Sequence, residues 1–218
     1  MDIDDQRAYL CAAAHQLASA GHTIGTGGNL SARVGEHVLV TPSGCRLDSV
    51  SPEQLVVVDL DGTVAVPTPY RPTSELRIHL DIYRTSSTAA VAHAHPIASV
   101  AVGNIVDELP AIHYTAAMLG GSVRVAPYAV FGSPELSTGI NEALFERTAA
   151  LMRNHGAIAV GSNIETACEH IELLEWLCEV YLRSVSAGTP AVLDETQLIE
   201  VVATAARRHY TPFPGRER

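Results

Sequence analysis

The chain of 218 residues contains no lysine, because all 14 of its basic residues are arginine. A lysine amine is required for Schiff-base chemistry on a carbonyl substrate, for attachment of pyridoxal phosphate and for a Walker-type phosphate loop. The composition therefore excludes these three functions. Any carbon–carbon or carbonyl chemistry in this chain must use a metal ion instead.

Other features that would indicate a special class of protein are missing too. The four cysteines form no Cys-x-x-Cys pair, so we interpret them as reduced and structural. No apolar run reaches the roughly 20 residues that span a bilayer, and the acidic start is unlike a signal peptide, so we expect a cytoplasmic protein. The net charge of −10 offers no basic face to nucleic acid or an anionic membrane.

Length and composition predict one folded domain over residues 1–218, since 47% hydrophobic and 17% charged residues are usual for a globular protein. We expect helices at about residues 4–20, 73–84, 97–102, 114–119, 133–147, 163–187 and 194–209. Strands are expected at about residues 30–34, 38–41, 55–60, 63–66, 89–93, 123–126, 150–153 and 157–160. Hairpins early and strand–helix alternation later predict an α/β fold with a mixed, largely antiparallel sheet.

Two histidines two residues apart, His93 and His95, follow an apolar run that we interpret as a strand. Residues two apart on a strand project to the same face, so both imidazoles could bind one zinc-type ion. His155 also ends a short predicted strand. Alone it would be a hydrogen-bonded structural histidine, but beside the pair it becomes a third candidate ligand. The remaining histidines are expected to be structural: His15, His22, His37, His79, His113, His170 and His209.

Glu75 opens the helix that follows a proline-rich loop. One interpretation is structural, because an acidic residue in the first helical turn is favoured by capping and by the helix dipole. The other is functional: a carboxylate that completes the metal shell or acts as a general base beside it. The residues alone leave both open.

Three short segments have the composition of anion-binding loops: Thr26–Asn29, Thr41–Gly44 and Thr73-Ser74. Glycines allow backbone amides to approach an anion, and hydroxyl and amide side chains add donors. Each segment alone is an ordinary turn or cap. Three of them in an acidic chain without lysine indicate a phosphate pocket.

These motifs occur together in the order and approximate spacing of the class II aldolase/adducin family, which the chain resembles from its first helix to Tyr210. The motifs are Gly25-Thr26-Gly27-Gly28-Asn29-Leu30-Ser31, Thr41-Pro42-Ser43-Gly44, Ser74-Glu75-Leu76, His93-Ala94-His95-Pro96 and Asn154-His155-Gly156. The resemblance implies a three-layer α/β/α fold around a mostly antiparallel mixed sheet. It also implies a homotetramer with active sites at the subunit interfaces.

The resemblance further implies a set of site residues. His93, His95 and His155 become zinc ligands, and Glu75 becomes both a fourth ligand and the catalytic acid/base. The implied contacts to a substrate phosphate are Thr26, Gly28, Asn29, Ser43, Gly44, Thr73 and Ser74.

Three aromatic residues complete the implied site. Tyr114 matches a tyrosine that is supplied across the subunit interface and donates a proton to the aldehyde product. Phe131 and Tyr210 match residues that close the pocket, Tyr210 as a catalytic one. The chain departs from the family at Thr73, where serine is usual, at Ser43, where threonine is common, and in its divergent C-terminal segment.

The implied reaction is zinc-dependent, reversible cleavage of a ketose 1-phosphate of the L-fuculose 1-phosphate type. Its products are dihydroxyacetone phosphate and a short aldehyde such as L-lactaldehyde. Sibling sugar-phosphate epimerases or decarboxylases are an alternative, although the epimerases usually have aspartate where Glu75 stands. A non-catalytic, adducin-like interaction module is a second alternative.

Overall fold

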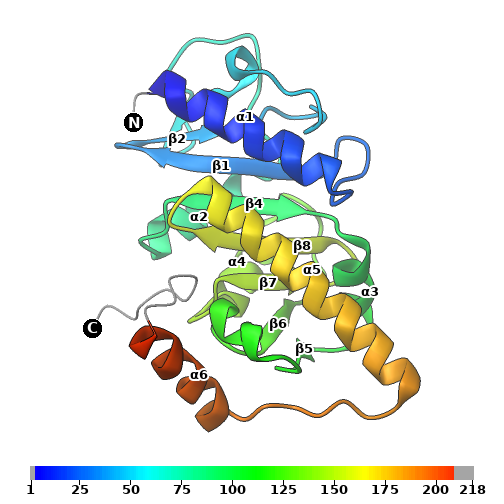
Figure 1. The fold of residues 1–218 in the computed structure, drawn as a ribbon. Coiled ribbons are helices and arrows are strands. Elements are labelled where there is room, and N and C mark those ends of the chain that lie inside the picture. The colour runs from blue at the N-terminus through cyan, green and yellow to red at the C-terminus, as the bar shows by residue number, and fades with distance from the viewer. Residues whose placement is uncertain (1–2, 209–218) are drawn as a thin grey trace.

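A mixed sheet runs through the centre of the molecule, with helices on both faces (Figure 1). The computed structural model describes residues 3–208. The strands are β1 (Asn29–Val34), β2 (His37–Val40), β3 (Val56–Asp59), β4 (Ala90–Ala94), β5 (Glu108–Leu109), β6 (Val123–Ala126), β7 (Ala149–Met152) and β8 (Gly156–Gly161). Their order is β3-β2-β1-β4-β8-β7-β6-β5, and all neighbouring pairs except the parallel β6–β7 pair are antiparallel.

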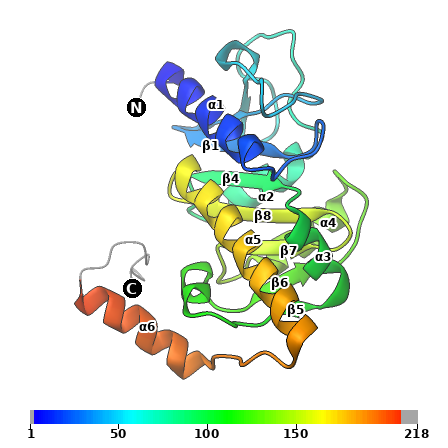
Figure 2. The ribbon, with the colours of Figure 1, turned by 45° about the vertical axis from the view of Figure 1, so that its right-hand side comes forward.

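Helices cover the two faces of the sheet separately (Figures 1 and 2). One face carries α1 (Ile3–Ser19), α3 (Ile97–Ile105) and α5 (Ile164–Ala187), and the other carries α2 (Leu76–Thr85) and α4 (Pro134–Ala143). Each face has its own hydrophobic core.

The central strands are apolar throughout because both of their faces are buried. All five residues of β4 are buried, and they alternate between the two cores: Ala92 packs into the first and Val91 into the second. The predicted α/β/α fold with a mixed sheet is therefore confirmed. Among residues 3–208, no helix is long and apolar enough to cross a membrane.

One local prediction was wrong, and the structure adds detail to others. Residues 63–66 form no strand, because after the turn at Gly62 only the single bridge Val58–Val64 forms before prolines lead the chain away. The predicted helix at 114–119 is the 3-10 helix η2 (Tyr114–Leu119), which Gly120 ends with a φ of 89°. The two-residue strand β5 was not predicted. A second 3-10 helix, η1 (Pro52–Gln54), follows Ser51, which is its N-cap residue.

The last helix, α6 (Glu195–Arg207), lies outside the three layers. It follows an extended connection from α5 and packs on η2 (Figures 1 and 2). Of the 13 residues of α6, Ala205 alone is buried. Much of the apolar surface of α6 is therefore left uncovered within one chain.

The four cysteines are free thiols, and three of them are buried. Burial raises the pKa of Cys11 to about 11 and that of Cys168 to about 12, which disfavours the reactive thiolate. The expectation that they are reduced and structural agrees with this placement.

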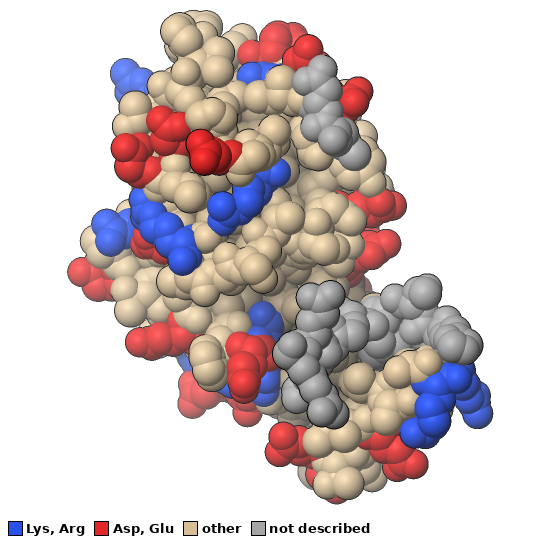
Figure 3. Space-filling model, turned by 90° about the vertical axis from the view of Figure 1, so that its left-hand side faces the viewer, with Lys and Arg blue, Asp and Glu red and all other residues tan. Residues whose placement is uncertain are grey.

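On the face drawn in Figure 3, groups of arginine side chains lie beside acidic ones.

Candidate metal centre and active site

Three histidines converge at one end of the central strands. His93 and His95 come from the end of β4, and His155 comes from the turn between β7 and β8. One ring nitrogen of each lies within 4.8 Å of the others, and the Nε2 atoms of His93 and His95 are 3.1 Å apart. The structure therefore brings together all three histidines that the sequence singled out.

Glu75, just before α2, completes the cluster. Its Oε2 lies 3.1 Å from His93 Nε2 and its Oε1 lies 3.4 Å from His155 Nε2. Ligand atoms about 2.0–2.1 Å from a tetrahedral ion are roughly 3.3–3.4 Å from one another. The spacing between these side chains is thus that of ligands sharing one ion.

Local backbone features orient the ligands. His93 Nδ1 donates a hydrogen bond to the Ala157 carbonyl at 2.9 Å, so Nε2 is the ring nitrogen that faces the cluster. This Nε2 lies beside Glu75 Oε2, and it offers a lone pair to a metal once it is deprotonated. The backbone N–H of His95 donates to the His22 carbonyl. Asn154, directly before His155, has a φ of 55°, a left-handed conformation that asparagine tolerates.

Two glycines leave room for the His95 ring. A Cβ atom on Gly27 would lie 2.6 Å from His95 Nδ1, and one on Gly156 would lie 2.7 Å from His95 Cδ2. Such distances are far below van der Waals contact. The ring therefore fits between the first glycine-rich loop and the start of β8 only because both positions lack a side chain.

The ionisation of the cluster suits a divalent cation. Burial, reinforced by neighbouring histidines, lowers the pKa of His95 to about 3 and that of His155 to about 4, so these rings are neutral and offer lone pairs. Burial raises the pKa of the Glu75 carboxyl, but the neighbouring rings of His93 and His155 and the hydrogen bonds from His93 and Asn29 lower this pKa by more than burial raises it. The result lies well below the usual range, and Glu75 is ionised.

One atom of the cluster has no hydrogen-bond partner. Among the buried side-chain oxygen and nitrogen atoms of residues 3–208, Glu75 Oε1 is the one that makes no hydrogen bond. Because an unpaired buried polar atom is costly, it indicates a group that the protein atoms do not supply. Three imidazole nitrogens and one carboxylate oxygen fit zinc, and they also suit other divalent transition metals.

The predicted phosphate loops lie beside this cluster. The backbone of Thr73 donates to Thr41 and that of Ser43 donates to Arg71, so the second and third loops run side by side. The first loop reaches the end of β4, where a Cβ on Gly28 would lie 2.9 Å from the His93 carbonyl. Exposed residues of the three loops are Thr26, Ser43, Gly44 and Ser74, whereas Gly28, Asn29 and Thr73 are buried.

The predicted aromatic residues are placed differently. Tyr114 is half exposed at the start of η2, its ring contacts that of His113, and it lines a cavity of about 530 Å³ with α6. Phe131 is exposed in the turn before α4, next to Gly132, whose Cβ would touch the Ser74 carbonyl. Tyr210 lies outside the described residues. The cross-subunit role of Tyr114 remains a prediction.

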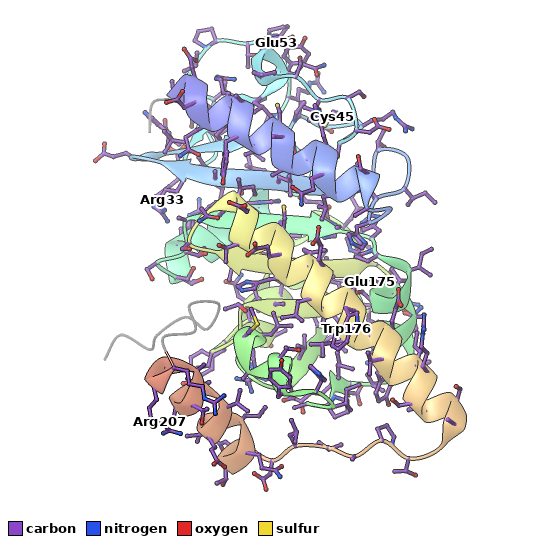
Figure 4. The ribbon with its side chains drawn as sticks, in the orientation of Figure 1. Arg33, Cys45, Glu53, Glu175, Trp176 and Arg207 are labelled. Atoms are coloured by element: carbon purple, nitrogen blue, oxygen red, sulfur yellow. The ribbon has the colours of Figure 1, made fainter. Side chains whose placement is uncertain are left out.

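Two residues near the site were missed. Glu175 of α5 accepts hydrogen bonds from the backbone N–H groups of Ala98 and Ser99, and it thereby caps the helix that begins two residues after His95 (Figure 4). His79 was expected to be structural, yet it bonds to Asn29 next to Glu75. The four-residue spacing of Glu75 and His79 on a helix was the available signal.

His79 should make the stability of the metal-free protein depend on pH. Burial above all, and also the charge of His93, lowers the pKa of His79 to about 3, from about 6.5 when unfolded. Between these values the unfolded chain binds a proton that the native chain does not. The free energy of unfolding should therefore fall with decreasing pH from about 6.5, His79 contributing about 1.4 kcal/mol per pH unit.

Urea unfolding of chelated protein between pH 7 and pH 4.5 measures this effect. His79→Gln should have a shallower pH dependence than the unsubstituted protein, although its stability at pH 7 can differ. Parallel curves for the two proteins would contradict the assignment.

Comparison with known proteins agrees with this geometry. The family model described as Class II Aldolase and Adducin N-terminal domain matches residues 8–182. A 5-deoxy-D-ribulose 1-phosphate aldolase of Bacillus thuringiensis serovar kurstaki is 35% identical over 91% of this chain and 94% of its own length. An L-fuculose phosphate aldolase of Escherichia coli strain K12 is 34% identical over 86% of this chain and 87% of its own.

Solved structures show the same similarity. An L-fuculose 1-phosphate aldolase superimposes with a TM-score of 0.88 at 32% identity, covering 93% of this chain and 96% of that one. The aldolase similarity extends beyond the histidines to almost the whole chain. The chain belongs to the class II aldolase and adducin family.

Proposed function

We propose that this protein is a metal-dependent aldolase that reversibly cleaves a ketose 1-phosphate into dihydroxyacetone phosphate and a short aldehyde. The observation that carries the proposal is the cluster of three histidines with the buried Glu75, whose Oε1 lacks a hydrogen-bond partner. The aldolase names of the relatives support it.

The histidines and Glu75 would hold the ion, with zinc as the proposed metal. Such an ion, when bound, stabilises the negative charge that develops on the ketone oxygen during cleavage of the C3–C4 bond. In a chain without lysine, no lysine side-chain amine is available for this purpose. The ligand residues must therefore be the part of the chain that makes carbon–carbon chemistry possible.

Glu75 is the proposed acid/base. Its carboxylate is ionised and buried beside the cluster, so it can accept a proton without competition from bulk water. In the condensation direction it removes a proton from the carbon next to the ketone of dihydroxyacetone phosphate. In the cleavage direction it returns that proton to the same carbon.

The three loops are proposed to hold the substrate phosphate. Their exposed residues include Thr26, Ser43 and Ser74, and the third loop leads through Glu75 directly into α2. Backbone N–H groups before a helix and at glycine-rich turns bind phosphate without requiring a lysine. A substrate anchored in this way presents its ketone to the histidines.

Assembly into a homotetramer is also proposed, with Tyr114 of one subunit protonating the new alkoxide at the site of another. The exposure of Tyr114 and the uncovered surface of α6 support an interface in this region. The mass of the particle in solution tests the number of chains.

Product analysis tests the proposed reaction. Zinc-loaded protein would be incubated separately with L-fuculose 1-phosphate, with 5-deoxy-D-ribulose 1-phosphate and with a ketose 5-phosphate such as ribulose 5-phosphate, and the products would be identified by mass spectrometry. We expect dihydroxyacetone phosphate from at least one ketose 1-phosphate and from no 5-phosphate, with lactaldehyde or acetaldehyde as the second product.

Other products would identify the alternatives. Inversion of a carbon centre without chain cleavage would indicate an epimerase, and release of carbon dioxide would indicate a decarboxylase. Absence of any reaction together with absence of stoichiometric metal would favour the interaction module. Each of these outcomes would contradict the aldolase proposal.

A further inference from the structure

A row of buried polar side chains leads from Glu75 into the protein, away from the histidine cluster. Asn29 Nδ2 lies 2.9 Å from Glu75 Oε2, and Asn29 Oδ1 lies 2.5 Å from His79 Nε2. On the other side of the ring, Ser31 Oγ lies 2.7 Å from His79 Nδ1 and 2.8 Å from the hydroxyl of Tyr83. All five side chains are buried.

The residues of this row come from two elements that face each other. Glu75, His79 and Tyr83 are spaced by four residues along the start and length of α2, so they share one face of the helix. Asn29 and Ser31 are two residues apart on β1, so they share one face of the strand. The row is therefore a ladder of polar contacts between β1 and α2.

The direction of each hydrogen bond follows from the end at Glu75. The carboxylate oxygen Oε2 accepts from the Asn29 amide, so Asn29 donates through Nδ2 and turns its Oδ1 toward His79. That oxygen can only accept, so His79 must carry its proton on Nε2.

The far end of the row has a direction too. His79 is neutral because burial, and then the charge of His93, lowers its pKa to about 3. Its Nδ1 therefore accepts from the Ser31 hydroxyl, and the Ser31 oxygen can accept from Tyr83, whose pKa is raised by burial. Every hydrogen in the row then points toward Glu75, an arrangement in which the bonds strengthen one another.

A reversed Asn29 amide would disturb this arrangement at the carboxylate. Its Oδ1 would then face Glu75 Oε2 and its Nδ2 would face the Nε2–H of His79, which would set acceptor against acceptor and donor against donor. The protonated Nε2 of His79 thus permits only one orientation of the amide. With Oε2 held by Asn29, Oε1 remains as the carboxylate oxygen without a hydrogen-bond partner.

We propose that His79 is a positioning residue, which fixes the Asn29 amide so that it holds Glu75 in its working orientation. The inference rests on the proposed function, in which Glu75 is the acid/base. His79 does not touch the substrate in this role and exchanges no proton during the reaction. It acts through Asn29, because a catalytic group held loosely loses rate, by up to roughly 10²-fold for a displacement of about 1 Å.

Two substitutions distinguish the hydrogen bond of His79 Nε2 to Asn29 from that of Nδ1 to Ser31. The amide nitrogen of His79→Gln can occupy the place of Nε2 and donate to Asn29, whereas the shorter His79→Asn reaches only toward Ser31. The matched control is His170→Asn, since His170 is another buried histidine, on α5, whose Nδ1 bonds to the Val160 carbonyl.

Exchange of deuterium from solvent into dihydroxyacetone phosphate measures the step assigned to Glu75 without an aldehyde. His79→Asn should slow this exchange, and kcat for cleavage, by about ten-fold or more. KM and metal content should stay unchanged. His79→Gln should recover most of the rate, and His170→Asn should behave like the unsubstituted protein.

Three kinetic outcomes would overturn the inference. They are an unchanged exchange rate in His79→Asn, equal losses in the Gln and Asn variants, and a loss confined to KM or to metal content.

Because a substitution inside a buried row can unfold the protein, a second measurement uses the unsubstituted chain.

Nitrogen NMR of metal-free protein labelled with ¹⁵N-histidine reports the tautomer of His79. The His79 signal is identified by its absence from the Gln variant. We expect a protonated Nε2 and an unprotonated Nδ1 that persist to pH 5, whereas a proton on Nδ1 would overturn this inference alone. Absence of deuterium exchange in the unsubstituted zinc-loaded protein would instead overturn the proposed function and the role of Glu75.

Discussion

Replacing Glu75 by glutamine should slow turnover by at least roughly 10²-fold, the usual cost of removing a general base. Glutamine has nearly the same shape, so the fold should persist. The three histidines remain, so bound metal should stay close to one ion per chain. What is lost is the ability to accept a proton from the carbon next to the ketone.

Steady-state kinetics, metal analysis and thermal unfolding check this expectation together. Glu53→Gln is the matched control, because Glu53 lies exposed at η1 and its removal should change none of the three (Figure 4). A Glu75→Gln protein that is folded, metal-loaded and fully active would show that Glu75 is only a helix-terminal residue or a ligand.

Removal of the metal should abolish aldol cleavage, and added zinc should restore it. The reason is chemical, since a chain without lysine has no amine to take up the electrons released when the carbon–carbon bond breaks. For the same reason, borohydride should trap no covalent intermediate in either form. Activity that survives in fully metal-free protein would contradict the proposal.

A ligand variant sharpens the test. His155→Ala removes the nitrogen that faces Glu75 Oε1, so metal affinity should fall by at least about 10-fold. Zinc concentrations that restore the chelated protein should then fail to restore this variant. Equilibrium dialysis gives the affinity directly, and full restoration at equal zinc would remove His155 from the ligand set.

The sequence predicted best what depends on near neighbours in the chain. The shared strand face of His93 and His95 required only the two-residue repeat of a strand, and most helices and strands were found by periodicity. Residues 63–66 were misjudged because a β-branched run does not reveal how soon the chain leaves its partner strand. The 3-10 geometry of η2 was likewise hidden, because its apolar spacing resembles that of an α-helix.

Contacts between residues that are far apart in the sequence could not be predicted from local patterns. His155 could be added to the pair only as a candidate, since its place depends on the pairing of β4 with β8. Asn29 was predicted as a phosphate contact, and that role stays a prediction. The hydrogen bonds of its side chain to Glu75 and His79 were not predicted, because they depend on the packing of α2 on β1. Tyr114 is predicted to act at the active site of another subunit, so a single chain cannot show its contacts.

The pairing of β4 with β8 also determines when the metal can act during folding. His93 and Ala157 are 64 residues apart in the chain, so their strands meet only after a long loop has closed. Before that event the ligands are scattered, and an ion has no preformed place to bind. A metal ion bound at this site would therefore stabilise the finished structure by mass action, but it would not direct the folding of the chain toward that structure.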